Sequence, residues 1–440
     1  MKFNFLNKIK QAPNGPEARQ ALTIFFACLL IASMMLSPFL LSISMWGLVA
    51  VGLWQSAVSC REQGIVRNAR TVAAWRQILV WSFRRLFQRP PLALLLLLLA
   101  APTLSCFWSA DLAYWLRRVQ TRLPFLVLPW VFANLPPLSG RQMRLVLYAF
   151  VWMLLLICLG IALHFALHFH EIVAGIGRGD PIPVPRSHIR FSLILAIGIV
   201  SGAWLWAEGF YWRSPRERLA LAATTVFLFL FIHVLSVRSG ILGLYAMLLF
   251  GLGWYVWHTR RWVVGALALG IVVAAPIVAM KTLPSFRMRV HYMIWDWQQY
   301  RQNTGGAYSD AERIVSLHTG WQLWRANPVF GVGTGDLPTE VQRVTKEQYP
   351  QYSKEPKLPH NQFLYILAGT GVFGLALSLV AFFAPLATPL YRRFFLFSTF
   401  QILVFSSFMV EYTIETAIGV AFYLFFTLWF MKMAEVNESA

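Results

Sequence analysis

The stretch SDAERIVSLHTGWQLWRANPVFGVGTGD occupies residues 309–336, and LPHNQFLYILAGTGVFG follows at residues 358–374. Together they close the one long hydrophilic segment of a chain that is otherwise mostly apolar. The first block predicts a helix that ends at Ala326, because Asn327 and Pro328 stop it. The second opens a long apolar run after Pro359, which predicts the start of a membrane span near residue 360.

The composition excludes an ordinary soluble domain. The chain is 58% hydrophobic and only 13% charged, whereas soluble domains carry about 25% charged residues. Repeated apolar runs of about 20 residues predict an all-α polytopic membrane protein with about twelve spans, and a β-barrel would show short alternating segments instead. The weakest span is 123–138, which contains four prolines and is either a full span or a re-entrant segment.

The net charge of +20 does not indicate nucleic acid, because the basic residues flank the spans. Lys and Arg of the short loops concentrate on the side that carries both termini. The positive-inside rule therefore places the termini in the cytoplasm and the long loop outside. We predict three parts: 1–280 with nine spans, 281–361 as one large outer loop with amphipathic helices, and 362–440 with three spans and a cytoplasmic tail.

Several ionisable residues are predicted to meet on the outer face. The turn LSVRSGILG between two spans places Arg238 at the membrane boundary, and the turn FMVEYTIE does the same for Glu411. The outer loop that ends in PVPRSHIRFS supplies Arg186, His188 and Arg190. All of them fall on the side of the long loop, so they are candidates for one site.

The helix of the first block presents a further candidate. Ser309 and Glu312 have the spacing of a capping box at its start. Residues at helical spacing predict a face that lies against the bundle or at the lipid interface: Arg313, Leu317, Trp321 and Trp324. Arg313 would then lie close to the membrane surface. The alternative is an ordinary surface arginine paired with Asp310 or Glu312.

The glycine run Gly331-x-Gly333-x-Gly335 is not a nucleotide-binding loop. No strand precedes it, no P-loop lysine follows it and no helix begins directly after it. It predicts a sharp turn that leaves the helix.

His360 lies at the predicted start of a span, with Asn361 as a plausible N-cap. A helix N-terminus favours a nearby anion and keeps an adjacent imidazole neutral. A neutral imidazole beside a phosphate site can accept a proton from a hydroxyl. The alternative is an interfacial histidine with no chemical role. The four cysteines lie in or beside apolar runs, and the histidines lack a convincing ligand spacing, so we expect no metal and no cofactor.

Three motifs in order carry a family resemblance. They are SVRSG (236–240), Arg313 followed by Trp324 and NPVFGVG (327–333), and HNQFLYILAGTGVFG (360–374). This set resembles the O-antigen ligase and polymerase superfamily, and Glu411 with Tyr412 resembles a motif near the end of related protein O-oligosaccharyltransferases. The resemblance implies a GT-C-like glycosyltransferase with one large periplasmic loop, in the bacterial inner membrane.

The resemblance also implies an activity and a set of substrates. Glycan would pass from an undecaprenyl-diphosphate carrier to an acceptor hydroxyl, with inversion and without ATP or metal. Arg238 and Arg313 would neutralise the leaving diphosphate, with Arg186, His188, Arg190 and Asn361 as further substrate-binding residues. His360 would deprotonate the acceptor or bind the diphosphate, and Glu411 would orient His360 or be the base itself.

The acceptor distinguishes the functions that we consider. An O-antigen ligase would use lipid A–core oligosaccharide, a polymerase the growing glycan, and a protein O-oligosaccharyltransferase a protein. A transporter or flippase for lipid-linked glycans is the alternative that is not an enzyme. Such a protein would carry charges or broken helices at mid-membrane, whereas the ionisable residues here cluster at span ends.

Overall fold

The computed structural model describes residues 15–67, 69–302, 309–352 and 354–438, and within these ranges the chain is helical and contains no strand. The chain is an all-α polytopic membrane protein. Ten helical segments in the described part are long and apolar enough to cross a bilayer. They are α2 (Pro16–Leu36), α3 (Pro38–Glu62), the run from α5 (Pro90–Ala93) through α6 (Leu97–Leu104) to Phe107, α9 (Gly140–Leu167), α11 (His188–Ala207), α12 (Glu217–Leu235), α13 (Arg238–Thr259), α14 (Trp262–Thr282), α18 (Gln362–Ala387) and α21 (Ala417–Glu438).

Two of the twelve predicted spans are shorter than a membrane-spanning helix. The predicted span 394–410 is α20 (Phe395–Val410), with 16 residues. The predicted span 123–138 is α8 (Pro124–Ala133), with only 10 residues, which is about 15 Å of helix. Prolines account for its length, because Pro124 starts α8 and the extended segment with Pro136 and Pro137 follows it. The remaining helices are α4 (Val72–Phe87), α7 (Leu112–Arg122), α10 (Phe169–Gly177), α15 (Pro284–Arg301), α16 (Ser309–Ala326), α17 (Leu337–Gln348) and α19 (Pro389–Arg392).

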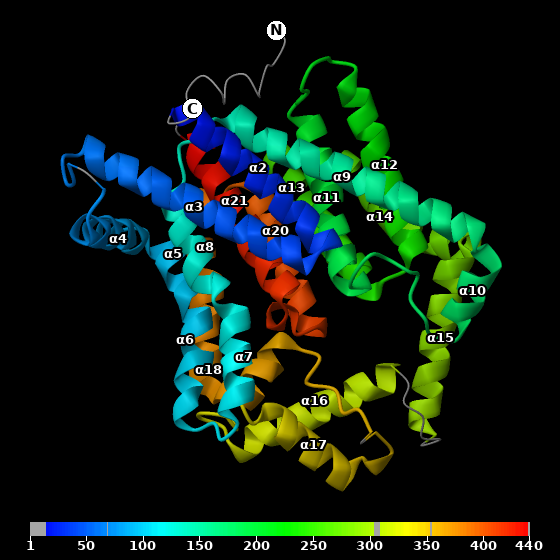
Figure 1. The fold of residues 1–440 in the computed structure, drawn as a ribbon. Coiled ribbons are helices and arrows are strands. Elements are labelled where there is room, and N and C mark those ends of the chain that lie inside the picture. Colours follow the sequence, from blue (N-terminus) through cyan, green and yellow to red (C-terminus); the bar gives the residue numbers. More distant parts are fainter. Residues whose placement is uncertain (1–14, 68, 303–308, 353, 439–440) are drawn as a thin grey trace.

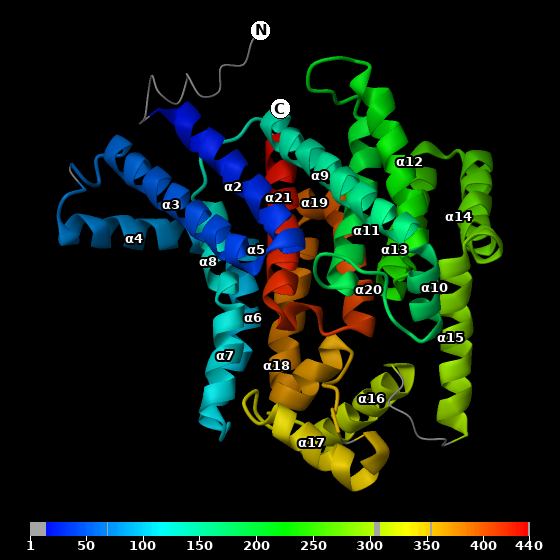
Figure 2. The ribbon, with the colours of Figure 1, turned by 45° about the vertical axis from the view of Figure 1, so that its right-hand side comes forward.

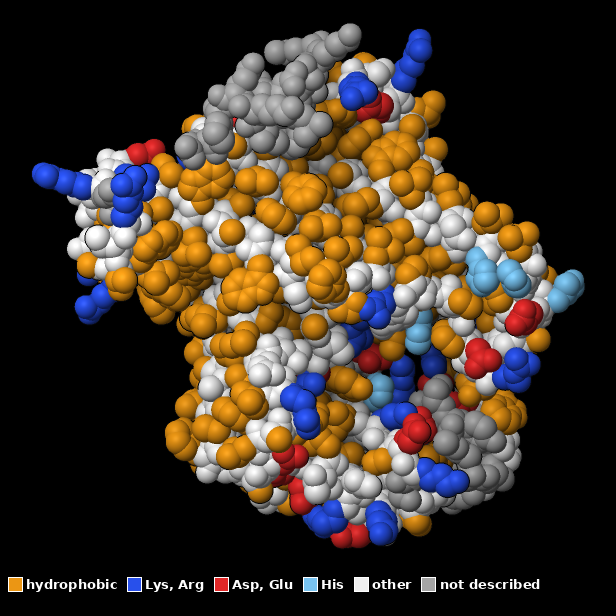
Figure 3. All heavy atoms as spheres, viewed as in Figure 1, with side chains coloured by type: hydrophobic (Ala, Val, Ile, Leu, Met, Phe, Trp, Pro, Cys, Tyr) orange, Lys and Arg blue, Asp and Glu red, His pale blue; other side chains and the backbone are white. Residues whose placement is uncertain are grey.

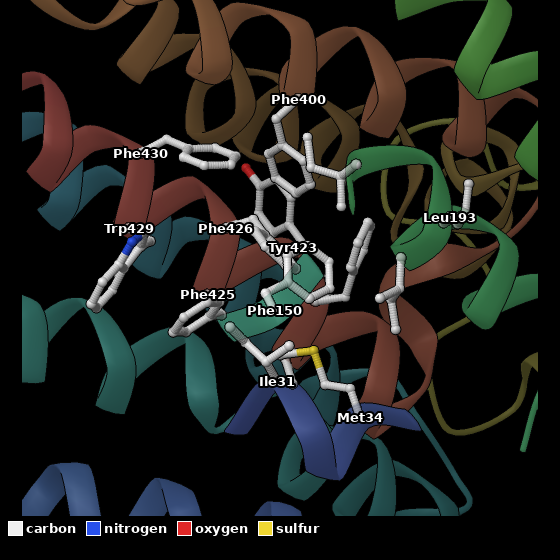
Figure 4. Close-up of a cluster of buried hydrophobic side chains, with 14 of the residues drawn as sticks. Ile31, Met34, Phe150, Leu193, Phe400, Tyr423, Phe425, Phe426, Trp429 and Phe430 are labelled. Atoms are coloured by element: carbon white, nitrogen blue, oxygen red, sulfur yellow. The ribbon is translucent and has the colours of Figure 1, made fainter. Parts of the chain in front are cut away.

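The core of the bundle is built around α21, most of which is buried. Tyr423, Phe426 and Trp429 on α21 are fully buried. The ring of Phe426 lies 5.3 Å from that of Phe150 on α9 and 5.6 Å from that of Phe400 on α20 (Figure 4). Large aromatic side chains bury much apolar area and pack edge to face, so they hold α20 and α21, and the turn between them, in a fixed position.

The helices between α14 and α18 form a layer at one end of the bundle. Figures 1 and 2 show α16 and α17 (yellow) at that end, together with the outer end of α15. The start of α2 and the end of α21 lie at the opposite end (Figure 2). The turn between α20 and α21 points toward the layer of α16 and α17 (Figure 1).

Helix α18 is broken at Gly371, and the segment between α16 and the glycine run docks on the break. Gly371 has a φ of +64°, and the backbone N–H groups of Val372 and Phe373 donate to the carbonyls of Pro328 and Val329, at 2.9 and 3.1 Å. A Cβ at Gly371 would lie 2.1 Å from the Val329 oxygen, which explains why this position is glycine. Irregular backbone at membrane depth is tolerated where protein covers it.

The glycine run is a turn, as predicted from the sequence, but α17 begins directly after it at Leu337, so the prediction that no helix follows was wrong. Gly331 and Gly333 have φ values of +68° and +95°, which side chains with a Cβ rarely adopt. The N–H groups of Val332 and Gly333 donate to the carbonyls of Ala368 and Gly369 on α18, both at 2.9 Å. The turn therefore fixes the end of α16 against the first half of α18.

Helix α16 ends at Ala326, as predicted. The face predicted to lie against the bundle or at the lipid interface is partly covered, and its Trp321 side chain is 49% exposed. The buried positions are Ala311, Val315, Ser316, Thr319 and Leu323. Among them, Ala311, Ser316 and Thr319 are small and allow α16 to approach its neighbours closely.

The first turn of α16 is held by another helix. Asp296 on α15 is fully buried, and its Oδ2 accepts the backbone N–H of Asp310 at 2.7 Å. Burial raises the pKa of Asp296, whereas this hydrogen bond lowers it, and the net direction is upward. The predicted capping box depends on the side chain of Ser309, which lies outside the described residues.

Candidate active site

One buried carboxylate joins two of the predicted site residues. Glu411 directly follows α20 and is 2% exposed. Its Oε1 accepts a hydrogen bond from Arg313 Nη2 at 2.8 Å, and its Oε2 lies 3.4 Å from His360 Nδ1. Three residues from α16, from the segment before α18 and from the turn after α20 therefore meet at Glu411.

Arg313 is not an ordinary surface arginine. It was an open question whether it pairs with Asp310 or Glu312 on its own helix, and the structure pairs it with Glu411 instead. Its side chain is 30% exposed, so it remains accessible beside a carboxylate that is almost fully buried. The helix start fixed by Asp296 lies one turn before Arg313 and sets where this guanidinium can reach.

His360 is held by its backbone as well as by its ring. Its N–H donates to Ser316 Oγ on α16 at 3.2 Å, and the ring meets the ring of Tyr412 edge to face at 5.1 Å. Nδ1 faces Glu411, but among the described residues it makes no hydrogen bond of good geometry. Because Nδ1 faces Glu411, Nε2 on the other side of the ring is the nitrogen left for another partner, and the side chain is 14% exposed.

The charge state of Glu411 follows from its neighbours. Burial acts to raise the pKa of this carboxyl, but the adjacent His360 ring and the charges of Arg313 and Arg190 outweigh burial. The net effect lowers the pKa of Glu411 below its ordinary value, so the group is ionised at neutral pH. An ionised carboxylate of this kind is a good hydrogen-bond acceptor and a weak base.

Arg238 is the first residue of α13 and reaches across to α16. Its Nη1 lies 2.6 Å from Oδ2 of Asp310, and its side chain is 34% exposed. Arg238 and Arg313 are therefore attached to the same end of α16, one through Asp310 and the other as a member of the helix. Both predicted arginines have a carboxylate partner and both remain partly exposed.

The three predicted site residues of the outer loop and the start of α11 differ in burial and in their contacts. Arg190 is buried, its Nε lies 3.5 Å from Thr416 Oγ1, and its charge acts on Glu411. His188 is half-buried at the start of α11. Arg186 is exposed and makes no ion pair with any described residue. Arg190 is thus close enough for its charge to lower the pKa of Glu411, whereas the ion pairs of Glu411 in the described part of the chain do not include Arg186.

Asn361 is used as a structural cap. Its Oδ1 accepts the N–H of Leu364 at 3.0 Å, which confirms the predicted N-cap of α18. Its Nδ2 donates to the carbonyl of Met409 at 3.0 Å. Because both ends of the amide are engaged, Asn361 ties α18 to α20 in this structure.

Arg289 on α15 also lies near the site, although no sequence motif predicts it. Its Nη1 and Nη2 donate to the carbonyls of Gly179 and Asp180, each at 2.9 Å. Burial and the nearby charge of Arg238 lower the pKa of Arg289. The local sequence FRMRVHY gives no motif, so only the fold reveals that this arginine holds the outer loop beside the site.

A hollow opens beside these residues. Figure 3 shows basic, acidic and histidine side chains gathered in a recess between the apolar bundle and the layer below it. Within the described ranges, no three His, Cys, Asp or Glu side chains gather as a candidate metal site. The chemistry that these side chains can perform is anion binding by arginine and proton transfer by histidine.

Comparison with known proteins shows which family the chain resembles. Residues 223–379 match the family model described as O-Antigen ligase. The resemblance to the O-antigen ligase family is confirmed. The matched segment of this O-antigen ligase-like chain runs from α12 into α18 and includes Arg238, Arg313 and His360, whereas Glu411 lies beyond it.

A curated protein is also similar to the chain. It is named O-antigen ligase, from Salmonella typhimurium, and is 25% identical over 238 residues. The match spans about half the length of that protein, 53%, and the same share of this chain.

Proposed function

We propose that this chain is an O-antigen ligase. It would transfer glycan from an undecaprenyl-diphosphate carrier to a sugar hydroxyl of lipid A–core oligosaccharide, at the periplasmic face of the bacterial inner membrane. The family resemblance supports the reaction class. The observation that carries the proposal is the pairing of both His360 and Arg313 with the buried carboxylate of Glu411.

His360 is the proposed base. Its Nδ1 faces Glu411, so a neutral ring can keep the Nδ1 proton on that side and accept the acceptor's hydroxyl proton at Nε2. The lowered pKa of Glu411 argues against the carboxylate as the base, because an acid that ionises easily binds a proton weakly. Glu411 instead orients the ring and stabilises the imidazolium that forms.

The arginines are the proposed ligands of the leaving group. The acceptor oxygen attacks the anomeric carbon opposite the diphosphate, the bond from this carbon to the phosphate oxygen breaks, and the configuration inverts. Negative charge then develops on the lipid diphosphate. Arg313 and Arg238 are partly exposed and never lose their charge, so they can bind its oxygens.

The arrangement of the helices supports the proposed side of the membrane. The start of α2 and the end of α21 lie opposite to the layer of α16 and α17 (Figure 2). If the basic short loops hold the termini in the cytoplasm, the site faces the periplasm. The lipid tail of the donor would then lie among apolar helices, and its diphosphate at the outer boundary.

The test is to identify the product. Purified protein in detergent receives undecaprenyl-diphosphate glycan and lipid A–core, without nucleotide and with EDTA, and products are resolved by mass spectrometry. Glycan on lipid A–core is the expected result. Longer carrier-linked glycan would assign the chain to the polymerases. If neither product forms but the lipid-linked donor crosses a liposome bilayer, the chain is a transporter and the proposal is wrong.

A further inference from the structure

Three consecutive residues at the start of α18 contact the end of α20 or the turn that follows it. His360 faces Glu411, and Asn361 donates to the carbonyl of Met409. The third residue, Gln362, is fully buried and bonds to the same turn twice. The segment that carries His360 is therefore attached to the chain before Glu411, at Met409, and after it, at Ile414 and Glu415.

Gln362 uses both ends of its amide in this attachment. Nε2 donates to Glu415 Oε1 at 2.8 Å, and Oε1 accepts the N–H of Ile414 at 3.0 Å. A glutamine that makes a donor and an acceptor contact with one short segment fixes that segment in both position and orientation. Gln362 is two residues from His360, and Ile414 is three residues from Glu411.

Glu415 is fixed in turn by α7. Arg118 Nη2 donates to the carboxylate and to the main-chain carbonyl of Glu415, both at 2.7 Å, and Arg122 Nη2 donates to Oε1. The side chain of Glu415 is 1% exposed and that of Arg122 is 4% exposed. Arg122 also donates to the carbonyl of Leu98 on α6 at 3.2 Å, so the cluster is anchored to the bundle.

This cluster is rigid, because any arrangement that separates its buried charged partners is costly in free energy. Removing one partner of a buried ion pair leaves an uncompensated charge, which is strongly destabilising. Burial opposes ionisation of Glu415, but the charges of Arg122 and Arg118 and two side-chain hydrogen bonds lower its pKa overall. The carboxylate therefore stays charged and keeps its donors, and the turn from Glu411 to Thr416 has little freedom to move.

We propose that Gln362 and Glu415 are positioning residues that hold His360 and Glu411 at the separation and orientation the transfer requires. The inference rests on the proposed function, because it assigns a role to residues that neighbour the proposed base and its carboxylate. Neither residue reaches the recess itself, since both side chains are buried. They act on the reaction only through His360 and Glu411.

The proposal predicts a loss in turnover with little change in donor binding. His360 Nδ1 lies 3.4 Å from Glu411 Oε2, and a shift of about 1 Å in a catalytic group can reduce a rate about 100-fold. Arg313 and Arg238 belong to α16 and α13, and the two hydrogen bonds of the Gln362 side chain to Glu415 and Ile414 go to neither helix. Although Glu411 pairs with Arg313, the start of α16 is also held by Asp296, and Arg238 is held by Asp310. Weakening the Gln362 contacts should therefore reduce kcat and leave the KM for the lipid-linked donor almost unchanged.

The chain offers a matched control. Gln401 on α20 is also a buried glutamine, 2% exposed, and its Nε2 donates to Thr427 Oγ1 at 3.3 Å. Gln362→Met and Gln401→Met make the same chemical change in the same protein. Gln362→Asn, which keeps the amide but shortens the side chain, is the second variant if Gln362→Met does not fold.

The experiment measures kcat, the donor KM and the thermal unfolding midpoint of each purified variant in the transfer assay. We expect kcat to fall about 10- to 100-fold in Gln362→Met or Gln362→Asn, with donor KM within about twofold of wild type. Gln401→Met should keep kcat within about twofold of wild type, even if its unfolding midpoint falls as much as that of the Gln362 variants. Equal kcat losses at both glutamines, or a loss confined to KM, would overturn the positioning role.

This design separates the two proposals. Wild-type protein that makes no glycan product overturns the proposed function, and the positioning role falls with it. Wild-type protein that is active, with Gln362 variants that behave like Gln401→Met, overturns the positioning role alone.

Discussion

At the scale of single residues, Arg313 near the start of α16 differs from Arg325 near its end. Arg313 is paired with Glu411, whereas Arg325 is exposed. Lysine keeps the charge but lacks the planar fork that binds a carboxylate or phosphate through two N–H groups. We expect Arg313→Lys to reduce the transfer rate by about 10- to 100-fold. Arg325→Lys, measured in parallel, should stay near wild type, and equal losses would remove Arg313 from the site.

The ionisation of Glu411 also predicts a dependence of stability on pH. The pKa of Glu411 is lowered in the folded protein, so its ionised form contributes stability above its unfolded pKa of about 4.3. That contribution is lost as the pH falls through the lower folded value. The difference in unfolding midpoint between wild type and Glu411→Gln should be constant near pH 7 and shrink below about pH 4.3. A difference that grows on acidification would contradict the lowered pKa.

At the scale of elements, the break in α18 depends on one glycine. A Cβ at Gly371 would collide with the Val329 carbonyl, and the φ of +64° disfavours residues other than glycine. Gly371→Ala should therefore cost at least about 2 kcal/mol, from steric overlap and left-handed backbone strain. Gly253→Ala on α13 is the control, because a Cβ there meets nothing within 4 Å. Thermal unfolding in detergent checks both, and equal midpoints would contradict the role of the break.

The sequence predicted elements where local signals decide them. The end of α16 at Ala326 and the Asn361 cap of α18 both follow from residues beside the boundary. The sequence left open whether the tryptophan face of α16 lies against the bundle or at the lipid interface, and Trp321 is half exposed in the structure. It also left open whether 123–138 spans the membrane or is re-entrant, and α8 is too short to span it.

At the scale of the whole molecule, the proposed topology makes a direct prediction. Gln342 on α17 and Arg261 beside α14 are both exposed. Charge placement predicts that α17 faces the periplasm and Arg261 the cytoplasm. Gln342→Cys should react with a membrane-impermeant maleimide in cells whose outer membrane is permeable to it, and Arg261→Cys should react only after the inner membrane is disrupted. The reverse pattern would invert the proposed orientation.

The site was predictable only as a set of parts. Motif order and topology placed Arg238, Arg313, His360 and Glu411 on one face, and Glu411 was expected to orient His360 or to be the base. No local pattern indicated that Glu411 also pairs with Arg313. Arg289 was missed because its role depends on a distant loop. The same holds for the contact of Glu415 with α7, which joins residues almost 300 positions apart. Contacts of that range are set by packing of the bundle, and hydropathy and spacing do not report them.

The most direct test of the central claim, that His360 acts with Glu411 in glycan transfer, compares two histidines. The transfer rate to lipid A–core is measured for wild type, His360→Ala and His318→Ala, with EDTA and without nucleotide. His318 lies on the exposed side of α16, near Tyr349. We expect His360→Ala to lose at least about 100-fold, as removal of a general base does, while His318→Ala stays within about twofold of wild type. Transfer at the wild-type rate by His360→Ala would contradict the account.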